Sequence, residues 1–314
     1  MRTLFLPIFC LITFGLFAQE NPKDTTKYNT VKLYKVTLNS GKVYIGNIIS
    51  KDAKEVLIET KEVGEVLIPK YEISLIEEIP AHELGVDGIY RPSETFATRY
   101  FITTNGLPIK KGESYIQWNL YGPDFQFGVS DNFGIGVMTT WLGVPIIAQG
   151  KYSIKLGENV HLGLGGLLGT GSWIASDFGL ALPFSSFTVG DRRSNITFSA
   201  GYGSVWSDGQ TSGRALLSLA CMTKVSNKVS IVFDSFIVPA SGYKDETTQE
   251  YNPTTGQYYT VTTRKQRTGL AIFIPGIRWQ LSEEKAFQFG FTSFSYDGEV
   301  SPAVIPMLQW YRKL

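Results

Sequence analysis

Few residues of this sequence are of the types that carry out chemistry. Among its 314 residues there are two histidines, His82 and His161, and two cysteines, Cys10 and Cys221. A serine nucleophile needs a histidine beside it as general base. His161 lies in the stretch ENVHLGLGG, in which no serine follows two residues later and no nucleophile signature is present. We therefore interpret His161 as a structural residue at the start of a strand, and we predict no catalytic residues.

Two other stretches resemble binding motifs without meeting their requirements. The run GLGGLLGTG at 163–171 lies inside an alternating β pattern, without the helix or the Gly-Lys-Ser/Thr signature that a phosphate-binding loop requires. The loop 240–267 contains Asp245, Glu246 and Glu250, but not at the spacing of a calcium-binding loop. The sequence therefore predicts no cofactor and no metal site.

The composition and the N-terminus limit the class of protein and its compartment. Charged residues are 18% of the chain and the net charge is +1, which argues against nucleic-acid binding. Residues 1–18 combine Arg2, an apolar stretch and a final Ala18, a pattern typical of a cleaved signal peptide and too short for a membrane-spanning helix. A lipoprotein anchor at Cys10 is the alternative, but the apolar run after Cys10 does not fit it. Cleavage would leave only Cys221, so no internal disulfide is expected.

The first part of the mature chain predicts a small β domain. Residues 19–30 are polar and indicate a flexible lead-in, and 31–79 contain short strands with charged outer faces. The pattern VxLxSGKxYxGxI at 36–48, with GxVxIP at 64–69, resembles SH3-like and Sm-like barrels. Because lysine and glutamate are interleaved without an aromatic and basic platform, we expect a module that contacts protein rather than RNA. Residues 80–111, rich in proline and glycine, indicate a linker or adaptor.

From residue 112 onward the pattern changes to long alternating runs separated by polar turns. The turns alternate between a tight set, such as 130–132 and 282–284, and a more variable set, such as 169–176 and 239–267. Short turns at one rim and longer loops at the other are typical of transmembrane β-barrels, in which an even strand number places both chain ends at the short-turn rim. We expect about twelve strands, at 113–121, 123–130, 132–142, 145–156, 158–168, 177–189, 193–203, 214–225, 228–239, 268–281, 284–296 and 303–313.

The hairpin FQFGVSDNFGIGVMTTW at 125–141 poses the question that decides the fold. One face carries Phe127, Phe133 and Ile135, and the other carries Gln126 and glycines. The apolar face could pack in the core of a soluble β-sandwich or face lipid. Strands near the ~9–11 residues of a spanning strand, with aromatic residues near their ends, favour lipid. We therefore predict an all-β chain with a transmembrane barrel of about 12 strands over 112–314. A secreted, soluble β-sandwich binding protein is the alternative.

The ladder of alternating strands that ends with the chain resembles the outer-membrane β-barrels of Gram-negative bacteria. The stretches TTNGLPIKKGESYIQ (103–117), FGVSDNFGIGV (127–137) and ENVHLGLGG (158–166) are similar to uncharacterised envelope proteins of the Bacteroidota type. The resemblance covers about 100–314 and implies residence in the outer membrane, with the small domain in the periplasm. It also implies outer-membrane lipid and the barrel-assembly machinery as partners, and residues 31–79 would bind a periplasmic protein. The chain departs from such barrels in ending on Leu314 rather than an aromatic residue.

The lumen and one external loop are the remaining places for function. A narrow channel for a small solute and a plugged, structural barrel both fit the pattern, and a lipid-modifying enzyme built on His161 is a further alternative. Tyrosines of the loop 240–267 are candidate contacts for a ligand or for lipopolysaccharide sugars: Tyr243, Tyr251, Tyr258 and Tyr259. Candidate lumen-lining residues are those of the polar strand faces: Gln117, Asn119, Gln126, Gln149, Lys151, Lys155, Asp234 and Gln288.

Overall fold

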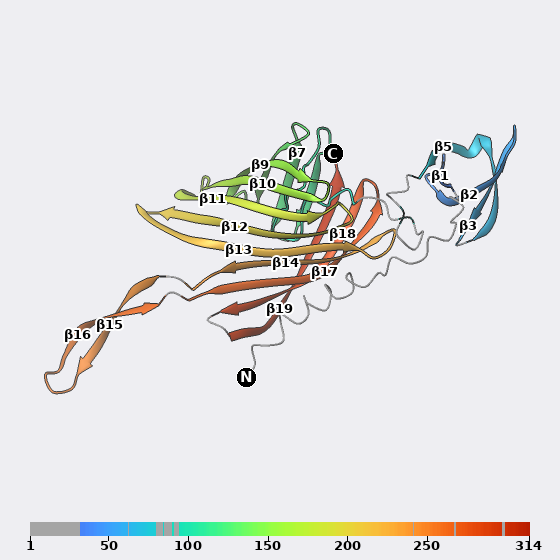
Figure 1. The fold of residues 1–314 in the computed structure, drawn as a ribbon. Helices are drawn as coiled ribbons and strands as arrows, with labels where there is room; N and C mark the ends of the chain where they lie inside the picture. The colour runs from blue at the N-terminus through green and yellow to red at the C-terminus, as the bar shows by residue number, and fades with distance from the viewer. Residues whose placement is uncertain are drawn as a thin grey trace. The chain divides into compact units, whose positions relative to one another are not determined.

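The computed structural model describes residues 32–61, 63–79, 84, 90, 94–240, 242–266, 268–296 and 299–314 (Figure 1). The chain divides into two compact units, 1–81 and 82–314. The predicted signal peptide 1–18 and lead-in 19–30, with Cys10, lie outside the described residues, as does His82. Within the described ranges, no helix is both long and apolar enough to cross a membrane.

The first unit is a five-stranded antiparallel sheet with the order β4-β3-β2-β1-β5. Val36, Leu38, Ile58 and Ile68 form its apolar core. Because side chains alternate along a strand, these residues all come from one face of the sheet. A single-turn 3-10 helix, η1 (Lys70–Glu72), joins the last two strands. The strands are β1 (Leu33–Leu38), β2 (Val43–Lys51), β3 (Glu55–Thr60), β4 (Gly64–Pro69) and β5 (Ile73–Glu78).

The second unit contains a closed barrel of twelve antiparallel strands, which confirms the predicted architecture. Each of the twelve predicted runs corresponds to one wall strand. Between β14 and β17 the chain forms a separate two-stranded hairpin, β15 (Tyr243–Asn252) and β16 (Gln257–Gln266) (Figure 1). The wall strands are β6 (Tyr115–Asn119), β7 (Gly122–Gly128), β8 (Phe133–Thr139), β9 (Ile146–Gly157), β10 (Val160–Gly171), β11 (Ala175–Gly190), β12 (Ser194–Ser207), β13 (Gln210–Lys224), β14 (Val229–Val238), β17 (Leu270–Ser282), β18 (Lys285–Tyr296) and β19 (Glu299–Lys313).

Several strands are longer than the sequence pattern indicated. The segment 169–176 was expected as a longer loop, and this was wrong, because β10 and β11 continue through most of it. β12 and β13 likewise extend beyond their predicted runs, 193–203 and 214–225. Asp208 and Gly209 have φ angles of 50° and 73°. Two consecutive residues with positive φ make the tight turn that best matches the twist of paired strands, so β12 and β13 stay paired up to it.

The barrel carries its apolar side chains on the outside. In the hairpin of β7 and β8, Phe127, Ile135 and Val137 are 36%, 42% and 41% exposed, whereas Gln126, on the other face, is 4% exposed. The same alternation continues around the wall, where Phe187, Phe198, Ile231, Trp279 and Phe291 are exposed. A β-sandwich buries such residues between its sheets. The closed barrel, with its polar face inward, therefore replaces the sandwich alternative.

Candidate functional site

Residues 94–111, which we call the plug, lie inside the barrel. Both ends of the plug lie near the rim that carries the β7–β8, β9–β10, β11–β12, β13–β14 and β17–β18 turns, which we call the tight-turn rim. Glu94 contacts Ser230, just after the β13–β14 turn, and the Gly128 N–H, just before the β7–β8 turn, donates to the Glu113 carbonyl at 3.2 Å. The plug thus begins and ends at the same rim. It is irregular in conformation, yet most of its side chains are almost completely buried: Glu94, Phe96, Ala97, Thr98, Arg99, Tyr100, Phe101, Asn105, Leu107 and Ile109.

This location gives the predicted linker or adaptor a definite place, because its residues 94–111 lie inside the barrel and hydrogen-bond to the wall. The sequence showed no periodic apolar pattern there because the plug forms no helix or strand. The missed signal was the cluster FATRYF at 96–101, in which three aromatic residues accompany an arginine. A solvated linker has little reason to carry so many large apolar groups.

Asp234 on β14 holds the middle of the plug. Its Oδ2 atom accepts hydrogen bonds from the backbone N–H groups of Phe101, Ile102 and Thr103, at 3.0, 2.6 and 2.9 Å. The Thr103 hydroxyl donates to Oδ1 at 2.6 Å. Consecutive N–H groups that converge in this way form an anion-binding concavity. The carboxylate of Asp234 therefore fixes the conformation of three successive plug residues.

Arg278 on β17 holds the plug from another side. Its guanidinium donates to the backbone carbonyls of Phe96 and Arg99, at 2.7 and 2.6 Å, and to the Gln288 side chain at 2.6 Å. It also lies 4.8 Å from the centre of the Tyr311 ring. The side chain is fully buried. Five fixed donors allow one arginine to satisfy several carbonyls that lack a partner in regular secondary structure.

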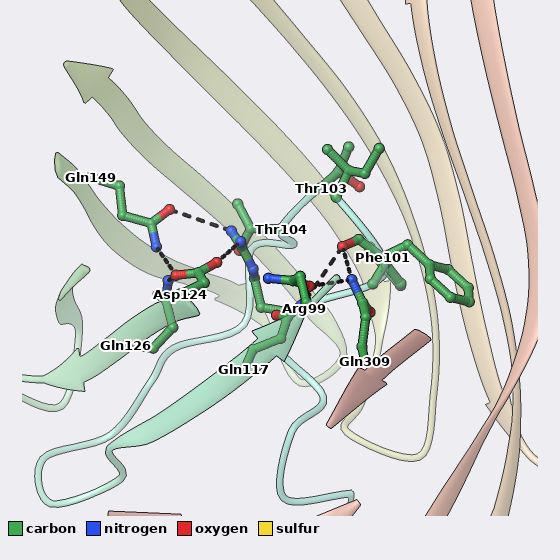
Figure 2. Close-up of polar contacts among 12 residues, drawn as sticks. Arg99, Phe101, Thr103, Thr104, Gln117, Asp124, Gln126, Gln149 and Gln309 are labelled. Carbon is green, nitrogen blue, oxygen red and sulfur yellow. Dashed lines mark hydrogen bonds and ion pairs between the residues drawn. The ribbon is translucent and has the colours of Figure 1, made fainter. Parts of the chain in front are cut away.

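An ion pair joins the plug to β7. The Arg99 guanidinium donates to the Asp124 carboxylate, and it also donates to the Gln149 side chain at 3.3 Å (Figure 2). The Gln126 and Gln149 side chains donate to the other oxygen of Asp124. The side chains of Arg99 and Asp124 are 6% and 1% exposed. Buried ions are tolerated when they are paired and hydrogen-bonded, and this pair meets both conditions.

Amide and ammonium groups of the wall bind further plug carbonyls. The Gln309 side chain donates to the Phe101 carbonyl at 2.7 Å, and the Gln117 side chain approaches the same oxygen at 3.5 Å (Figure 2). Lys151 donates to the carbonyls of Asn105 and Leu107, at 2.7 and 2.9 Å. The wall therefore recognises the plug mainly through its backbone, which makes the fit depend on plug conformation more than on plug side chains.

The plug also approaches β7 closely where it leaves the lumen, and glycine permits this. A Cβ atom built on Gly128 would lie 1.8 Å from the carbonyl oxygen of Lys110. Gly128→Ala is therefore expected to displace the end of the plug and to lower the free energy of unfolding by about 1–3 kcal/mol, as overpacking does. Urea denaturation of the refolded protein in micelles measures this. Gly166→Ala is the control, because its Cβ would meet nothing closer than 3.8 Å. Equal stability of the two variants would contradict the close approach.

The predicted lumen-lining residues lie on the inner face, most of them in contact with the plug. Gln117, Gln149, Lys151, Asp234 and Gln288 hydrogen-bond to it directly. Gln126 binds Asp124, Asn119 binds Gln117 and Gln309, and Lys155 is exposed near the tight-turn rim. Sequence reasoning missed Asp124, Lys224, Arg278 and Gln309. Asp124 lies on the same strand face as Gln126, and Arg278 and Gln309 pair with Gln288 from the neighbouring strands.

Beyond the plug, apolar side chains also lie on the inner face of the barrel. Gly163 of β10 faces inward, since a Cβ there would lie 3.1 Å from Gly106 of the plug. Gly169, six residues further, lies on the same face. A Cβ on Gly169 would meet Leu180 at 2.7 Å and Ile147 at 3.0 Å. Apolar side chains of the inner face thus lie beyond the plug as well as against it, where Ala220, Met222, Val232 and Ile274 form a core with plug residues.

The β15–β16 hairpin presents the four candidate tyrosines to solvent. Tyr251 and Tyr258 are cross-strand partners with ring centres 5.2 Å apart. The Arg264 guanidinium lies 4.8 Å from the centre of the Tyr243 ring. Tyr259 lies on the opposite face and donates to Glu250 at 2.9 Å. The four tyrosines therefore do not form one surface.

At the tight-turn rim, the β11–β12 turn is organised by Asp191. Partial burial alone would raise the pKa of Asp191. Hydrogen bonds from the Ser194 N–H and from the Arg193 side chain and N–H outweigh it and hold the pKa below its ordinary value. In the described part of the chain, His, Cys, Asp and Glu side chains form no group of three that could hold a metal ion.

No protein-family profile matches the chain, and no curated protein matches it in sequence. Several solved structures resemble the chain, with low sequence identity and low TM-scores. The NanC porin is 8% identical, with a TM-score of 0.40, over 64% of this chain and 98% of its own. OmpT, an outer membrane protein of Vibrio cholerae, is 9% identical, with a TM-score of 0.36, over 90% of this chain and 95% of its own. The Ralstonia pickettii toluene transporter TbuX is 10% identical, with a TM-score of 0.25, over 90% of this chain and 88% of its own. Similarities of this size carry no information about function.

Proposed function

We propose that the second unit spans the outer membrane of a Gram-negative bacterium as a barrel whose own plug keeps the lumen closed. The inverted burial pattern supports the membrane location. Large apolar side chains cover the outside, whereas Gln117, Arg278 and Gln288 are fully buried inside. Lipid stabilises such an exterior, and a closed barrel leaves no sheet edge unsatisfied in it.

The orientation follows from the rims. The Leu314 N–H donates to the Ser114 carbonyl at 2.8 Å, so the chain end and the start of β6 lie together at the tight-turn rim. Short turns face the periplasm in barrels of this kind. We propose that the small unit, 32–79, is an SH3/Sm-like module in the periplasm that binds a protein partner. Outer-membrane lipid and the barrel-assembly machinery remain the other predicted partners, with no nucleic acid.

The function that this geometry favours is a gated narrow channel. The single observation that carries it is the plug, which is bound to the wall through Asp234, Arg278 and Asp124. A solute can pass only when these bonds break, and the chain connects the plug to the small unit. Leu180 and Ile147, on the inner face beyond the plug, favour an apolar solute over a charged one. A permanently closed structural barrel is the second candidate, favoured by the number of plug contacts.

We propose no enzymatic role. His161 and Ser153 both lie on the inner face, but the Nδ1 atom of His161 and the hydroxyl of Ser153 have no hydrogen-bond partner. A nucleophile and its base are expected to be hydrogen-bonded to each other.

Cysteine labelling on intact cells tests the membrane topology. In a Cys221→Ala background, Thr254→Cys on the β15–β16 turn is expected to react with a membrane-impermeant maleimide added outside. Lys61→Cys in the small unit is the matched exposed site and is expected to react only after the outer membrane is permeabilised. Both residues are exposed. Labelling of Lys61→Cys on intact cells, or release of the protein without detergent, would contradict the proposal.

A further inference from the structure

A pocket lies where the plug meets the wall at the tight-turn rim. It has a volume of about 330 Å³. The plug contributes Pro108 and Lys110, and the wall contributes the rest: Asp131, Asn132, Ser153, Lys155 and His161. This pocket plays no part in the contacts that hold the middle of the plug.

Two polar groups of the pocket lack partners. The hydroxyl of Ser153 and the Nδ1 atom of His161 are buried and make no hydrogen bond. The Ser153 residue is only 3% exposed. A buried polar atom without a partner costs free energy, and native structures rarely retain one without a reason. Both atoms can act as donors, since a hydroxyl and a neutral imidazole nitrogen each carry a proton in one of their states.

The charges around these donors are mostly positive. Lys155 of β9 pairs with His161 of β10. Ser153 lies two residues before Lys155 and therefore on the same face of β9. Lys110 of the plug also lines the pocket. The acid of the lining, Asp131, is exposed in the β7–β8 turn. Two ammonium groups and two unused donors suit an anion with several oxygens rather than a cation.

We propose that this pocket binds a phosphate group and that the bound group joins the plug to the wall. A tetrahedral anion offers enough oxygens to accept from Ser153 and His161 while it lies between Lys110 and Lys155. Both lysines line the pocket, so without the anion their like charges repel each other. With it, their repulsion becomes attraction, so the ligand stabilises the closed state. The phosphate would come from a soluble periplasmic compound or from a phospholipid headgroup.

Calorimetric titration of the full refolded chain with inorganic phosphate, in zwitterionic micelles and against sodium chloride of equal ionic strength, tests the site. Lys155→Gln and Ser153→Ala are each expected to weaken binding about tenfold or more, in line with the loss of one hydrogen bond to a charged group. Lys285→Gln is the control, because Lys285 is an exposed lysine at the same rim outside the pocket. It is expected to bind phosphate as the wild type does.

A second arm separates the two sources of phosphate. Saturable binding of inorganic phosphate that depends on Lys155 supports the site with a soluble ligand. A rise in melting temperature that depends on Lys155 and occurs only in micelles doped with phosphatidylglycerol supports it with a lipid headgroup. The proposal is overturned if neither arm responds, or if Lys155→Gln and Lys285→Gln behave alike. These measurements do not depend on conductance, so they stand apart from the channel function.

Discussion

Replacing Asp234 by alanine is expected to release the plug and to turn a closed barrel into a conducting one. The carboxylate accepts three backbone N–H groups and one hydroxyl of the plug. Each of these donors would be left inside the barrel without its acceptor, at about 1–3 kcal/mol apiece before relaxation. We expect a net loss of about 3–5 kcal/mol in the free energy of unfolding, as for other broken buried charge sites.

Two measurements check this result. Planar-bilayer recording should show a closed wild type and frequent openings of Asp234→Ala, while urea denaturation in micelles measures the stability. Asp177→Ala is the matched control, because Asp177 is an exposed aspartate on β11. It should remain closed and stable. A variant of Asp234 that is destabilised but still closed would favour the structural barrel over the gated channel.

Breaking the ion pair of Arg99 and Asp124 is expected to have the second largest effect. Both side chains are buried, so Arg99→Met leaves an unpaired carboxylate and Asp124→Asn leaves an unpaired guanidinium. Each single substitution is expected to cost about 3–5 kcal/mol. The double variant leaves neither charge behind and should cost less than the sum, with a coupling energy of about 1–3 kcal/mol.

A double-mutant cycle on urea denaturation gives this coupling. The control cycle uses Arg193 and Asp191 in the β11–β12 turn, whose side chains are 26% and 41% exposed. Solvent screens that pair, so its coupling should be about 1 kcal/mol or less. Additive costs at Arg99 and Asp124 would mean that plug and wall are not coupled there.

The twelve wall strands could be predicted because their signal is local. A strand that is apolar on one face and polar on the other repeats every two residues, and this repeat is visible within ten residues of sequence. The tight turns are equally local, as Ser130 shows by accepting hydrogen bonds from the N–H groups of Asn132 and Phe133. The strand ends at the other rim were less predictable. The residues around a turn such as Asp208-Gly209 fit either a long loop or a tight hairpin, and only the pairing of the two strands selects the hairpin.

The plug could not be predicted in the same way. Its residues have no period, and its partners are remote: Asp234 lies 131 to 133 residues from the N–H groups that it binds. Sequence showed that Gln117, Lys151, Asp234 and Gln288 share the polar face of the wall strands. It did not show whether that face contacts water or protein, because polar side chains on the inner face can line a water-filled lumen or hydrogen-bond to a plug.

The sequence by itself therefore determined the all-β class, the twelve strands and the direction in which each strand face points, since all three follow from short-range alternation. Only the tertiary structure decided what fills the lumen. That outcome depends on closing the wall around residues 94–111, which brings Asp124, Asp234 and Arg278 to one segment from strands far apart in the chain. Contacts between residues so far apart in the chain produce no periodic pattern in the sequence.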